Sequence, residues 1–375
     1  MIISYEYKGP ASDPWHFTQT NYGKINLLVG ASGSGKTRFL NTLFNFATTV
    51  VNAKPFRTGN WIIKVLAGDV EYSWEYEGLS EDSLKREISK ELLKRKTSEN
   101  VEETLVERTA DYFNFCGTSL PKLQRDILSV TLLKEEAVIE PLFKIFAHIQ
   151  RREFHTAGLQ DAIAVQNVPS HIFEHFKNNP NLEDLWSQDH AVSAKMFLFK
   201  NFFPNIYEQA IRLFREVFPS VEDADVRFAQ NMNIPLRPEG SLPIFTVKEK
   251  GIKKWLPLSE LSSGMQKVLL IISDVLSLPR GSIYIIDEYE NSLGVNAIDF
   301  LPQFLIDYGA DNQFFVTTHH PYLINSMPIK NWSVFNRKGS IVTVKRGSEL
   351  EERFGKSKQK AFIQLMNDPF YAEVS

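Results

Sequence analysis

Residues 30–37 read GASGSGKT and match the spacing G-x-x-x-x-G-K-[ST] at every position. The apolar run 25–29 before them (INLLV) predicts a β-strand, and residues 37–50 after them predict a helix. Glycines let the backbone curl until successive N–H groups point at phosphate oxygens, and the helix adds its positive end. The stretch therefore predicts a phosphate-binding loop. A Gly/Ser loop that carries Lys36 by coincidence is the alternative, which the flanking strand and helix disfavour.

Two side chains of this loop carry the expected chemistry. Lys36 would reach the β- and γ-phosphates of a nucleoside triphosphate, and Thr37 would place its hydroxyl on Mg²⁺. ATP and Mg²⁺ are therefore the expected cofactors. The residues expected to hold the nucleotide here are Gly30, Ser32, Gly33, Ser34, Gly35, Lys36, Thr37 and Arg38.

The run 282–288 (SIYIIDE) is apolar until it ends in two carboxylates. Such a run is typical of a buried central strand, and open α/β sheets bind ligands at the carboxyl ends of such strands. We expect Asp287 to hold Mg²⁺, and Glu288 to polarise the attacking water as a general base. A strand that ends in a solvated acidic turn is the alternative, which the phosphate loop disfavours.

Two further segments have the spacing of a nucleotide site. The apolar run 268–278 predicts a buried helix, and Ser262 and Gly264 of the preceding LSSGMQ would lie at its N-terminus, an anion-binding position. A plain helix N-cap is the competing explanation, and it is favoured when the segment is taken alone. The second segment is the apolar run 314–318, which predicts a strand. His319 follows it and could donate to a γ-phosphate, although adjacent histidines are more often loop residues.

Composition excludes several other classes of protein. The chain has 375 residues, a net charge of −3 and a single cysteine, Cys116, so neither a disulfide scaffold nor a cysteine-based metal finger fits. No apolar run reaches the about 18 residues of a membrane span, and the first residues lack the pattern of a secretion signal. We expect a cytoplasmic protein with no membrane partner. A charge near zero gives no global attraction to nucleic acid.

The order of the segments predicts an α/β protein in three parts. Residues 1–130 hold the phosphate loop and antiparallel strands, 131–218 form a helical insertion, and 219–375 hold the LSSGMQ segment, the acidic strand, the histidines and a tail. Residues 131–215 contain 9 Lys/Arg and 10 Asp/Glu and show no sustained heptad, so they predict neither a basic DNA-binding surface nor a long coiled coil.

Patterns within these parts predict individual elements. Residues 61–66 and 70–76 flank Ala-Gly-Asp and predict a hairpin, whereas 81–97 place apolar residues at helical spacing and predict an amphipathic helix. Strand-like sequence returns at 104–115. Residues 225–230 and 244–248 predict two more strands.

Three weaker signals have common explanations. Residues 171–175 match H-x-x-E-H, an inverted zinc-protease pattern, but a surface or interdomain histidine pair is the commoner case. Residues 336–360 hold eight Lys/Arg and three Asp/Glu, which could contact nucleic acid or an acidic partner, although a solvated tail is more frequent. Residues 361–366 predict a short helix that docks on the body or on a partner.

The ordered segments GASGSGKT, LSSGMQ, IYIIDE, ENSLG and TTHH resemble those of ABC-type ATPases, in the branch that contains SMC, RecF and OLD-like proteins. The resemblance implies an ABC-ATPase head with a mixed or parallel core sheet around the phosphate loop and a helical insertion. It also implies a head that dimerises on ATP, in which Ser262 and Gly264 of one subunit face the nucleotide of the other.

The same resemblance assigns further roles. His319 would be the switch histidine, with His320 as neighbouring support, and Gln124 would be the Q-loop residue beside Mg²⁺. Residues 291–294 (NSLG) occupy the D-loop position but depart from the family's usual sequence, as LSSGMQ departs from LSGGQ. The sequence does not single out an adenine-stacking aromatic residue among Tyr5, Tyr7, Trp15 and Phe17.

The phrases DEYENSLG and THHPYLIN most resemble stand-alone ATPases of bacterial anti-phage systems, the PtuA and AriA types. Those proteins act together with a separate effector, often a nuclease. The OLD type instead carries a nuclease domain after the ATPase, and residues 321–375 leave little room for such a domain. The resemblance therefore implies a homo-oligomeric sensor or scaffold ATPase that controls a separate effector, expected to be a nuclease. The alternatives are a DNA-repair or chromosome-maintenance ATPase that binds DNA directly, and a scaffold that binds ATP without hydrolysing it.

Overall fold

The computed structural model describes residues 1–53, 58–82, 85–121, 124–153, 156–164, 166–187, 190–228, 242–290, 293–308, 311–354 and 358–372. The chain divides into two compact units. The first comprises Met1–Arg151, Gly281–Asp287 and Leu305–Ser375, and the second comprises Arg152–Arg280 and Glu288–Phe304. No helix in the described part of the chain combines the length and apolar character needed to cross a membrane.

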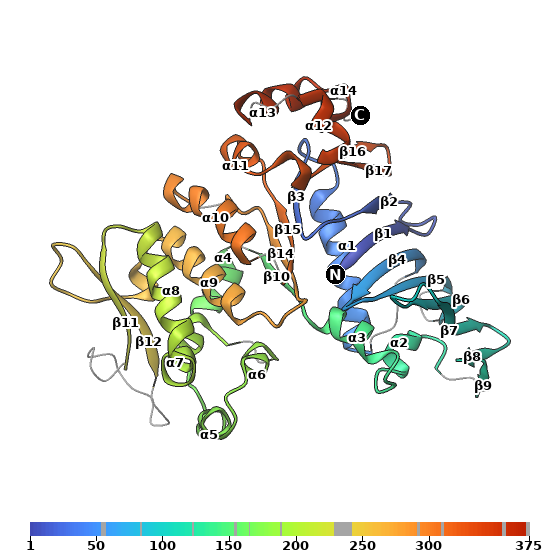
Figure 1. The fold of residues 1–375 in the computed structure, drawn as a ribbon, viewed down its shortest axis with the longest axis horizontal. Helices are drawn as coiled ribbons and strands as arrows, with labels where there is room; N and C mark the ends of the chain where they lie inside the picture. The colour runs from blue at the N-terminus through green and yellow to red at the C-terminus, as the bar shows by residue number, and fades with distance from the viewer. Residues whose placement is uncertain are drawn as a thin grey trace. The chain divides into compact units, whose positions relative to one another are not determined.

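One large sheet, with fourteen strands among the described residues, runs in the order β10-β14-β15-β3-β16-β17-β2-β1-β4-β5-β6-β7-β8-β9 (Figure 1). Its strands are β1 (Ile2–Lys8), β2 (His16–Asn21), β3 (Ile25–Val29), β4 (Gly59–Ala67), β5 (Val70–Asp82), β6 (Lys85–Lys96), β7 (Glu102–Thr109), β8 (Phe113–Phe115), β9 (Thr118–Leu120), β10 (Ile149–Glu153), β14 (Ile283–Asp287), β15 (Gln313–Thr317), β16 (Trp332–Lys338) and β17 (Ile341–Arg346).

The parallel part of the sheet positions the candidate site. β14 pairs in parallel with β15, and β15 pairs in parallel with β3, with Ile283 opposite Gln313 and Phe314 opposite Ile25. The carboxyl ends of these three strands therefore meet at one edge, where the phosphate loop begins. The strands predicted at 25–29, 282–288 and 314–318 are confirmed, and all three are almost entirely buried, as their continuous apolar sequence requires.

The antiparallel part contains one wrong prediction. The hairpin of β4 and β5 is confirmed, but residues 81–97 do not form a helix, because β5 extends to Asp82 and β6 pairs with both β5 and β7. Glu91 and Leu93 are both fully buried, so the burial alternates with a period of two. The apolar spacing happened to suit a helix as well, and pairing with two neighbouring strands decided the outcome.

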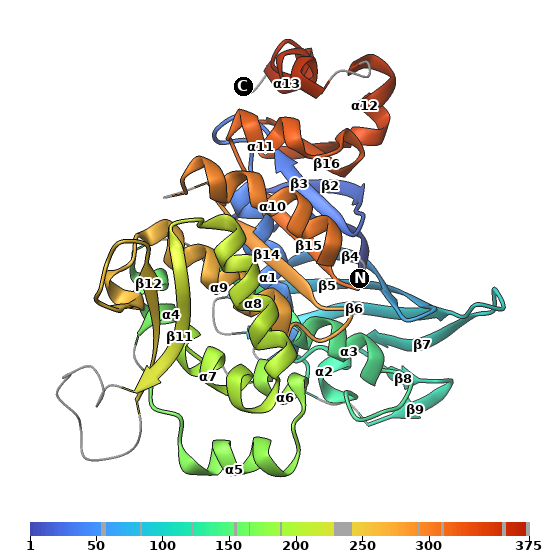
Figure 2. The same cartoon turned by 60° about the vertical axis from the view of Figure 1, so that its left-hand side comes forward.

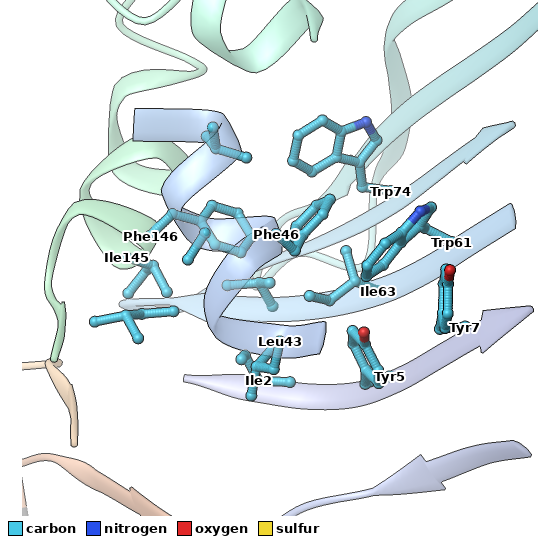
Figure 3. Packing of buried hydrophobic residues seen from close by; sticks show 14 of the residues in the cluster. Ile2, Tyr5, Tyr7, Leu43, Phe46, Trp61, Ile63, Trp74, Ile145 and Phe146 are labelled. Carbon is cyan, nitrogen blue, oxygen red and sulfur yellow. The ribbon is translucent and has the colours of Figure 1, made fainter. Parts of the chain in front are cut away.

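Helix α1 (Lys36–Val51) confirms the helix predicted after the loop, and it packs on the aromatic core of the first unit (Figure 3). Phe46 lies at the centre of that core, with its ring centroid 5.0 Å from that of Trp61 and 5.3 Å from that of Phe146. Aromatic contacts of this kind add to the burial of apolar surface. They hold the N-terminus of α1 in place at the end of β3.

The remaining helices of the first unit are α2 (Ser129–Leu132), α3 (Glu140–Ala147), α11 (Pro321–Ser326), the 3₁₀ turn η3 (Ile329–Asn331), α12 (Gly347–Phe354), α13 (Lys358–Met366) and α14 (Pro369–Ala372). Helix α10 (Val295–Tyr308) has residues in both units. The helix predicted at 361–366 is confirmed within α13.

The second unit packs helices against a small antiparallel sheet (Figure 2). Its elements are α4 (Thr156–Ile163), α5 (Ser170–Asn178), α6 (Leu182–Ser187), α7 (Val192–Phe202), α8 (Pro204–Val217), β11 (Val221–Phe228), β12 (Pro243–Glu249), β13 (Leu256–Pro257), the 3₁₀ turn η2 (Leu258–Glu260) and α9 (Ser263–Ser277). Strands β11 and β12 confirm the predictions at 225–230 and 244–248, except that residues 229 and 230 lie outside the described part.

The compact units divide the chain differently from the three predicted parts. The second unit begins at Arg152 and keeps α9, which the sequence had grouped with the C-terminal part. A buried ion cluster explains this: Asp274 of α9 accepts from Arg152 Nε at 2.7 Å and from Lys195 Nζ at 2.7 Å. The two cations keep the pKa of the Asp274 carboxyl below its usual range although burial opposes them. A paired cluster of this kind ties α9 to the helical segment.

Candidate nucleotide-binding site

The phosphate loop has the backbone that its glycines permit. Gly33 and Gly35 have φ values of 79° and 96°, in the left-handed region that favours glycine. A Cβ at Gly30 would lie 2.6 Å from Ser34 Oγ and 2.7 Å from the Phe335 carbonyl oxygen, so this position is also closed to a side chain. Gly35 caps α1 without a side-chain hydrogen bond, which leaves the first N–H groups of the helix available to an anion.

Lys36 is buried under the loop. Its Nζ donates to the carbonyl oxygens of Gly30 at 2.8 Å and Ala31 at 3.1 Å, and to Ser34 Oγ at 3.3 Å. A buried ammonium is stable only when oxygen acceptors surround it. These acceptors keep the positive charge in the loop, where phosphate oxygens would replace them.

Asp287 joins the loop to the end of β14. Thr37 Oγ1 donates to Asp287 Oδ1 at 3.3 Å, and Thr317 Oγ1 at the end of β15 donates to the same oxygen at 2.6 Å. A hydroxyl and a carboxylate are hard oxygen ligands of the kind that Mg²⁺ takes together with substrate phosphates. The donor set around Asp287 therefore fits Mg²⁺, and Thr37 and Asp287 are the residues that would hold it.

Arg151 lies on the other side of this carboxylate, and no sequence signal had singled it out. Its Nη2 donates to Asp287 Oδ2 at 3.2 Å, and its Nη1 donates to Asn41 Oδ1 of α1. Arg151 belongs to β10, the neighbour of β14 in the sheet. The signal that could have revealed it is the short polar strand IQRRE at residues 149–153, before the helical segment.

The backbone of Gln124 is held by residues of β6 and β7. Its carbonyl oxygen accepts from Arg108 Nη2 of β7 at 2.5 Å, and the Ile88 N–H of β6 donates to the next carbonyl, that of Arg125. These contacts place Gln124 beside β6 and β7, whereas β14 has β10 and β15 as its neighbours. Its assignment to Mg²⁺ stays a prediction, and the side chains that contact Asp287 in the structure include that of Arg151.

Glu288 has an unusual backbone. It follows β14 directly, is exposed, and has a φ of 52°, in the left-handed region that costs free energy for a residue with a Cβ. Strain of this kind gathers at functional sites, where the surrounding structure maintains it. The backbone strain therefore supports a functional role for Glu288.

Lys267 of α9 holds this strained segment. Its Nζ donates to the carbonyl oxygens of Glu288 at 3.2 Å and Tyr289 at 2.5 Å. Burial lowers the pKa of Lys267 from its ordinary value to about 7, although Glu290 and Glu288 oppose the shift. Sequence reasoning missed this residue because its partners lie more than twenty positions away.

The signature segment forms a helix N-cap. Ser262 precedes α9 and its Oγ accepts from the Met265 N–H at 3.3 Å, while Gln266 Nε2 donates to the carbonyls of Leu258 and Leu261. The capping explanation is thus confirmed. Ser262 is exposed and Gly264 is buried, and their contact with the nucleotide of a second subunit stays a prediction.

The histidines lie where the sequence suggested. His319 is exposed and follows the end of β15, two residues after Thr317, and the His320 N–H donates to Thr318 Oγ1 at 3.0 Å. The donation from His319 to a γ-phosphate stays a prediction. In the D-loop segment, residues 291 and 292 lie outside the described part.

The H-x-x-E-H pattern at 171–175 does not gather a metal site. His175 Nε2 lies 2.7 Å from Asp184 Oδ2 on an exposed surface. Within the described residues, no group of three or more His, Cys, Asp or Glu side chains could hold a metal ion.

One aromatic residue lies beside the phosphate loop. Tyr5, Tyr7 and Phe17 are buried in the core, whereas Trp15 is partly exposed. A Cβ at Gly35 would lie 3.6 Å from Trp15 Cζ3, so the indole borders the loop. The guanidinium groups of Arg38 and Arg337 lie 4.4 Å and 5.4 Å from the centroid of this indole.

Three solved structures resemble the fold. The SMC head bound to the C-winged helix domain of ScpA is 12% identical, with 92% of this chain and 97% of that chain covered and a TM-score of 0.52. The SMC head domain from Thermotoga maritima is 11% identical (92% and 98% covered, TM-score 0.42), and the SMC head domain with an extended coiled coil bound to the C-terminal domain of ScpA, from Pyrococcus furiosus, is 13% identical (98% and 98%, TM-score 0.48).

The likeness to the first of these structures shows an SMC-head type of ABC-ATPase fold, as the sequence predicted. No curated protein matches the sequence. A family model matches residues 25–325, which include the phosphate loop, α9, the acidic strand and the histidines. The chain therefore belongs to the ATPase family described as "AAA domain, putative AbiEii toxin, Type IV TA system".

Proposed function

We propose that this chain binds Mg²⁺ and ATP at residues 30–37 and hydrolyses the nucleotide, with Glu288 as the general base. The observation that supports it most is the 3.3 Å contact between Thr37 of the loop and Asp287 of β14. These residues are 250 positions apart, and their hydroxyl and carboxylate have the chemistry of a nucleotide-bound Mg²⁺ site.

Each part of the site would have its own role in binding or hydrolysis. The N–H groups of the loop and Lys36 would bind the phosphates, while Thr37 and Asp287 would hold Mg²⁺, which neutralises charge on the phosphate oxygens. Glu288 would accept a proton from the attacking water, and His319 would donate to a γ-phosphate oxygen. Trp15, whose face already stacks with Arg38, would stack on the base.

The proposal extends to two copies of the chain. Ser262 is exposed at the N-terminus of α9, where the helix dipole attracts an anion, so it can face the nucleotide of a second subunit. We infer that ATP closes such a dimer and that hydrolysis reopens it. The dimer would control a separate effector, expected to be a nuclease, in bacterial anti-phage defence.

Two findings support a protein partner. One of the similar structures is an SMC head bound to a domain of ScpA, so this fold can bind a partner protein. The family description refers to a putative toxin of a toxin–antitoxin system. Both agree with an ATPase that acts together with another protein.

The test compares wild type with Glu288→Gln in phosphate release and in size on a column with Mg²⁺ and ATP. We expect the variant to bind ATP, to release no phosphate and to accumulate as a dimer, because the base is lost while Asp287 remains. Ser262→Arg should block the dimer by steric bulk. Normal phosphate release by Glu288→Gln would assign the base elsewhere, and a dimer that Ser262→Arg does not weaken would contradict the proposed interface.

The defence role needs a separate test. Purification of the native complex, followed by mass spectrometry, should recover a nuclease, and phage plating efficiency should depend on both proteins and on Lys36. Recovery of DNA without a partner protein would favour the direct DNA-binding alternative.

A further inference from the structure

The positively charged guanidinium of Arg151 contacts the carboxylate of Asp287, which the proposed function assigns to Mg²⁺ binding. Its Nη2 lies 3.2 Å from Asp287 Oδ2, and the two side chains are only 7% and 10% exposed. Water screens such a pair weakly, so the charges act on each other and on any third charge that approaches.

Both carboxylate oxygens of Asp287 accept hydrogen bonds. Oδ1 accepts from the hydroxyls of Thr37 and Thr317, and Oδ2 accepts from Arg151. A divalent cation that takes the position of Arg151 at Oδ2 must displace the guanidinium. A cation that binds Oδ1 instead shares the carboxylate with Arg151, and the positive charge of the guanidinium repels it.

Asn41 keeps the guanidinium in this position. Arg151 Nη1 donates to Asn41 Oδ1, and Asn41 lies on α1, the helix that begins at the phosphate loop. The rigid fork of an arginine suits two acceptors at a fixed separation. Arg151 thus joins β10 to both α1 and the end of β14 within the first unit.

We propose that Arg151 is an internal cation that competes with Mg²⁺ for Asp287: a metal ion at Oδ2 displaces the guanidinium, and a metal ion at Oδ1 is repelled by its charge. The inference rests on the proposed function, because it needs Asp287 as the metal ligand. Arg151 is a positioning residue: it stabilises the carboxylate while the metal is absent and raises the Mg²⁺ concentration that the site requires. A site of this kind responds to the metal–nucleotide complex more than to the nucleotide alone.

The experiment separates metal binding from nucleotide binding. A fluorescent ATP analogue is titrated in EDTA, and Mg²⁺ is then titrated at fixed analogue to give the half-saturating Mg²⁺ concentration. In Arg151→Gln we expect this concentration to fall about tenfold, since a repulsive charge close to the metal is removed. The affinity in EDTA should stay unchanged, and Mn²⁺ binding followed by electron paramagnetic resonance should tighten in parallel.

Three further variants sharpen the result. Arg151→Lys keeps the charge, so its half-saturating Mg²⁺ concentration should remain closer to wild type. Asn41→Ala removes the second acceptor and should produce a smaller fall than Arg151→Gln. Arg125→Gln removes an exposed arginine that pairs with Glu87, and it should change neither quantity. Thermal unfolding of each variant shows that it is folded.

Several outcomes would overturn the inference. If Arg151→Gln requires as much Mg²⁺ as wild type, or more, then Arg151 does not compete with the metal. If its affinity in EDTA falls, or if Arg151→Lys behaves like Arg151→Gln, the guanidinium binds phosphate or has a structural role instead. If wild type itself does not bind the analogue, the proposed function fails, which the wild-type titration shows without any variant.

Discussion

Two buried lysines, Lys36 and Lys267, use the same chemistry in different surroundings. Each donates from Nζ to two backbone carbonyls: Lys36 to those of residues 30–31, and Lys267 to those of residues 288–289. The partners of Lys36 lie within six positions, in a loop with exposed glycine and serine, so phosphate oxygens can replace them. The partners of Lys267 lie more than twenty positions away.

The contrast shows how one interaction serves two purposes. In the proposed function Lys36 would bind phosphate, whereas Lys267, which donates to the carbonyls of residues 288 and 289, would stabilise the left-handed conformation of Glu288. If this distinction holds, loss of Lys36 will weaken ATP binding strongly, and loss of Lys267 will lower the turnover rate while ATP binding remains.

The largest effect is expected for Lys36→Ala. The phosphates lose their main cation, and truncation of a buried charged partner weakens binding by about a thousandfold. Calorimetric titration with ATP measures the change. Lys144→Ala, which removes an exposed lysine paired with Glu140, is the control and should bind as wild type does. Unchanged ATP affinity in Lys36→Ala would show that Lys36 does not bind the phosphates, and the distinction between the two lysines would then fail.

Next comes Lys267→Met, which keeps the volume of the side chain but releases the two carbonyls. A small displacement of a catalytic group costs about a hundredfold in rate, and we expect a fall of that order in kcat. ATP affinity should stay within about twofold of wild type, because the phosphate loop is untouched. A variant that loses ATP binding together with turnover would show that Lys267 supports the whole fold rather than Glu288.

A smaller effect is expected for Trp15→Ala. Loss of a stacking aromatic residue weakens binding of a base by about tenfold. The loss should be seen with ATP and not with inorganic triphosphate, which has no base to stack. Tyr112→Ala, at a surface turn where the hydroxyl bonds Glu107, is the matched control. Equal losses with ATP and triphosphate would place the base elsewhere.

The smallest effect concerns pH. Burial lowers the pKa of Lys267 to about 7, whereas the unfolded chain keeps the proton to about 10.5. Between these values the unfolded state binds more protons, so this group makes the free energy of unfolding rise with pH. The stability of wild type relative to Lys267→Met should therefore increase from pH 7 to pH 9. Urea unfolding measures it, and a difference that does not change with pH would contradict the assigned pKa.

Several parts of the fold could be predicted from local sequence patterns. The strand–loop–helix around residues 30–37, the apolar strands at β14 and β15, and the buried helix α9 were all predicted at nearly their observed bounds. In each case the residues that define the element are neighbours in sequence. The periodicity of the apolar residues and the positions of the glycines were therefore enough to predict the element.

Elements decided by distant partners were predicted less well. Residues 85–96 had helical spacing but became β6, because β5 and β7 offered backbone partners on both sides. Gln124 was assigned to Mg²⁺ from the family resemblance alone, and that assignment stays a prediction, whereas the contact of Arg151 with Asp287 follows from the position of β10 next to β14. A strand's neighbours depend on the whole sheet, and a local window does not contain them.

The amino-acid order was thus sufficient to identify an ATPase head, its phosphate loop and its acidic strand, since each is a contiguous signal with its own chemistry. Only the folded chain revealed that Thr37, Thr317 and Arg151 surround Asp287, and that Lys267 holds the segment after it. Those contacts join residues from 21 to 250 positions apart. They arise because parallel strands bring their carboxyl ends to one edge, and because a helix buried beside a strained turn can supply the hydrogen-bond donor that stabilises it.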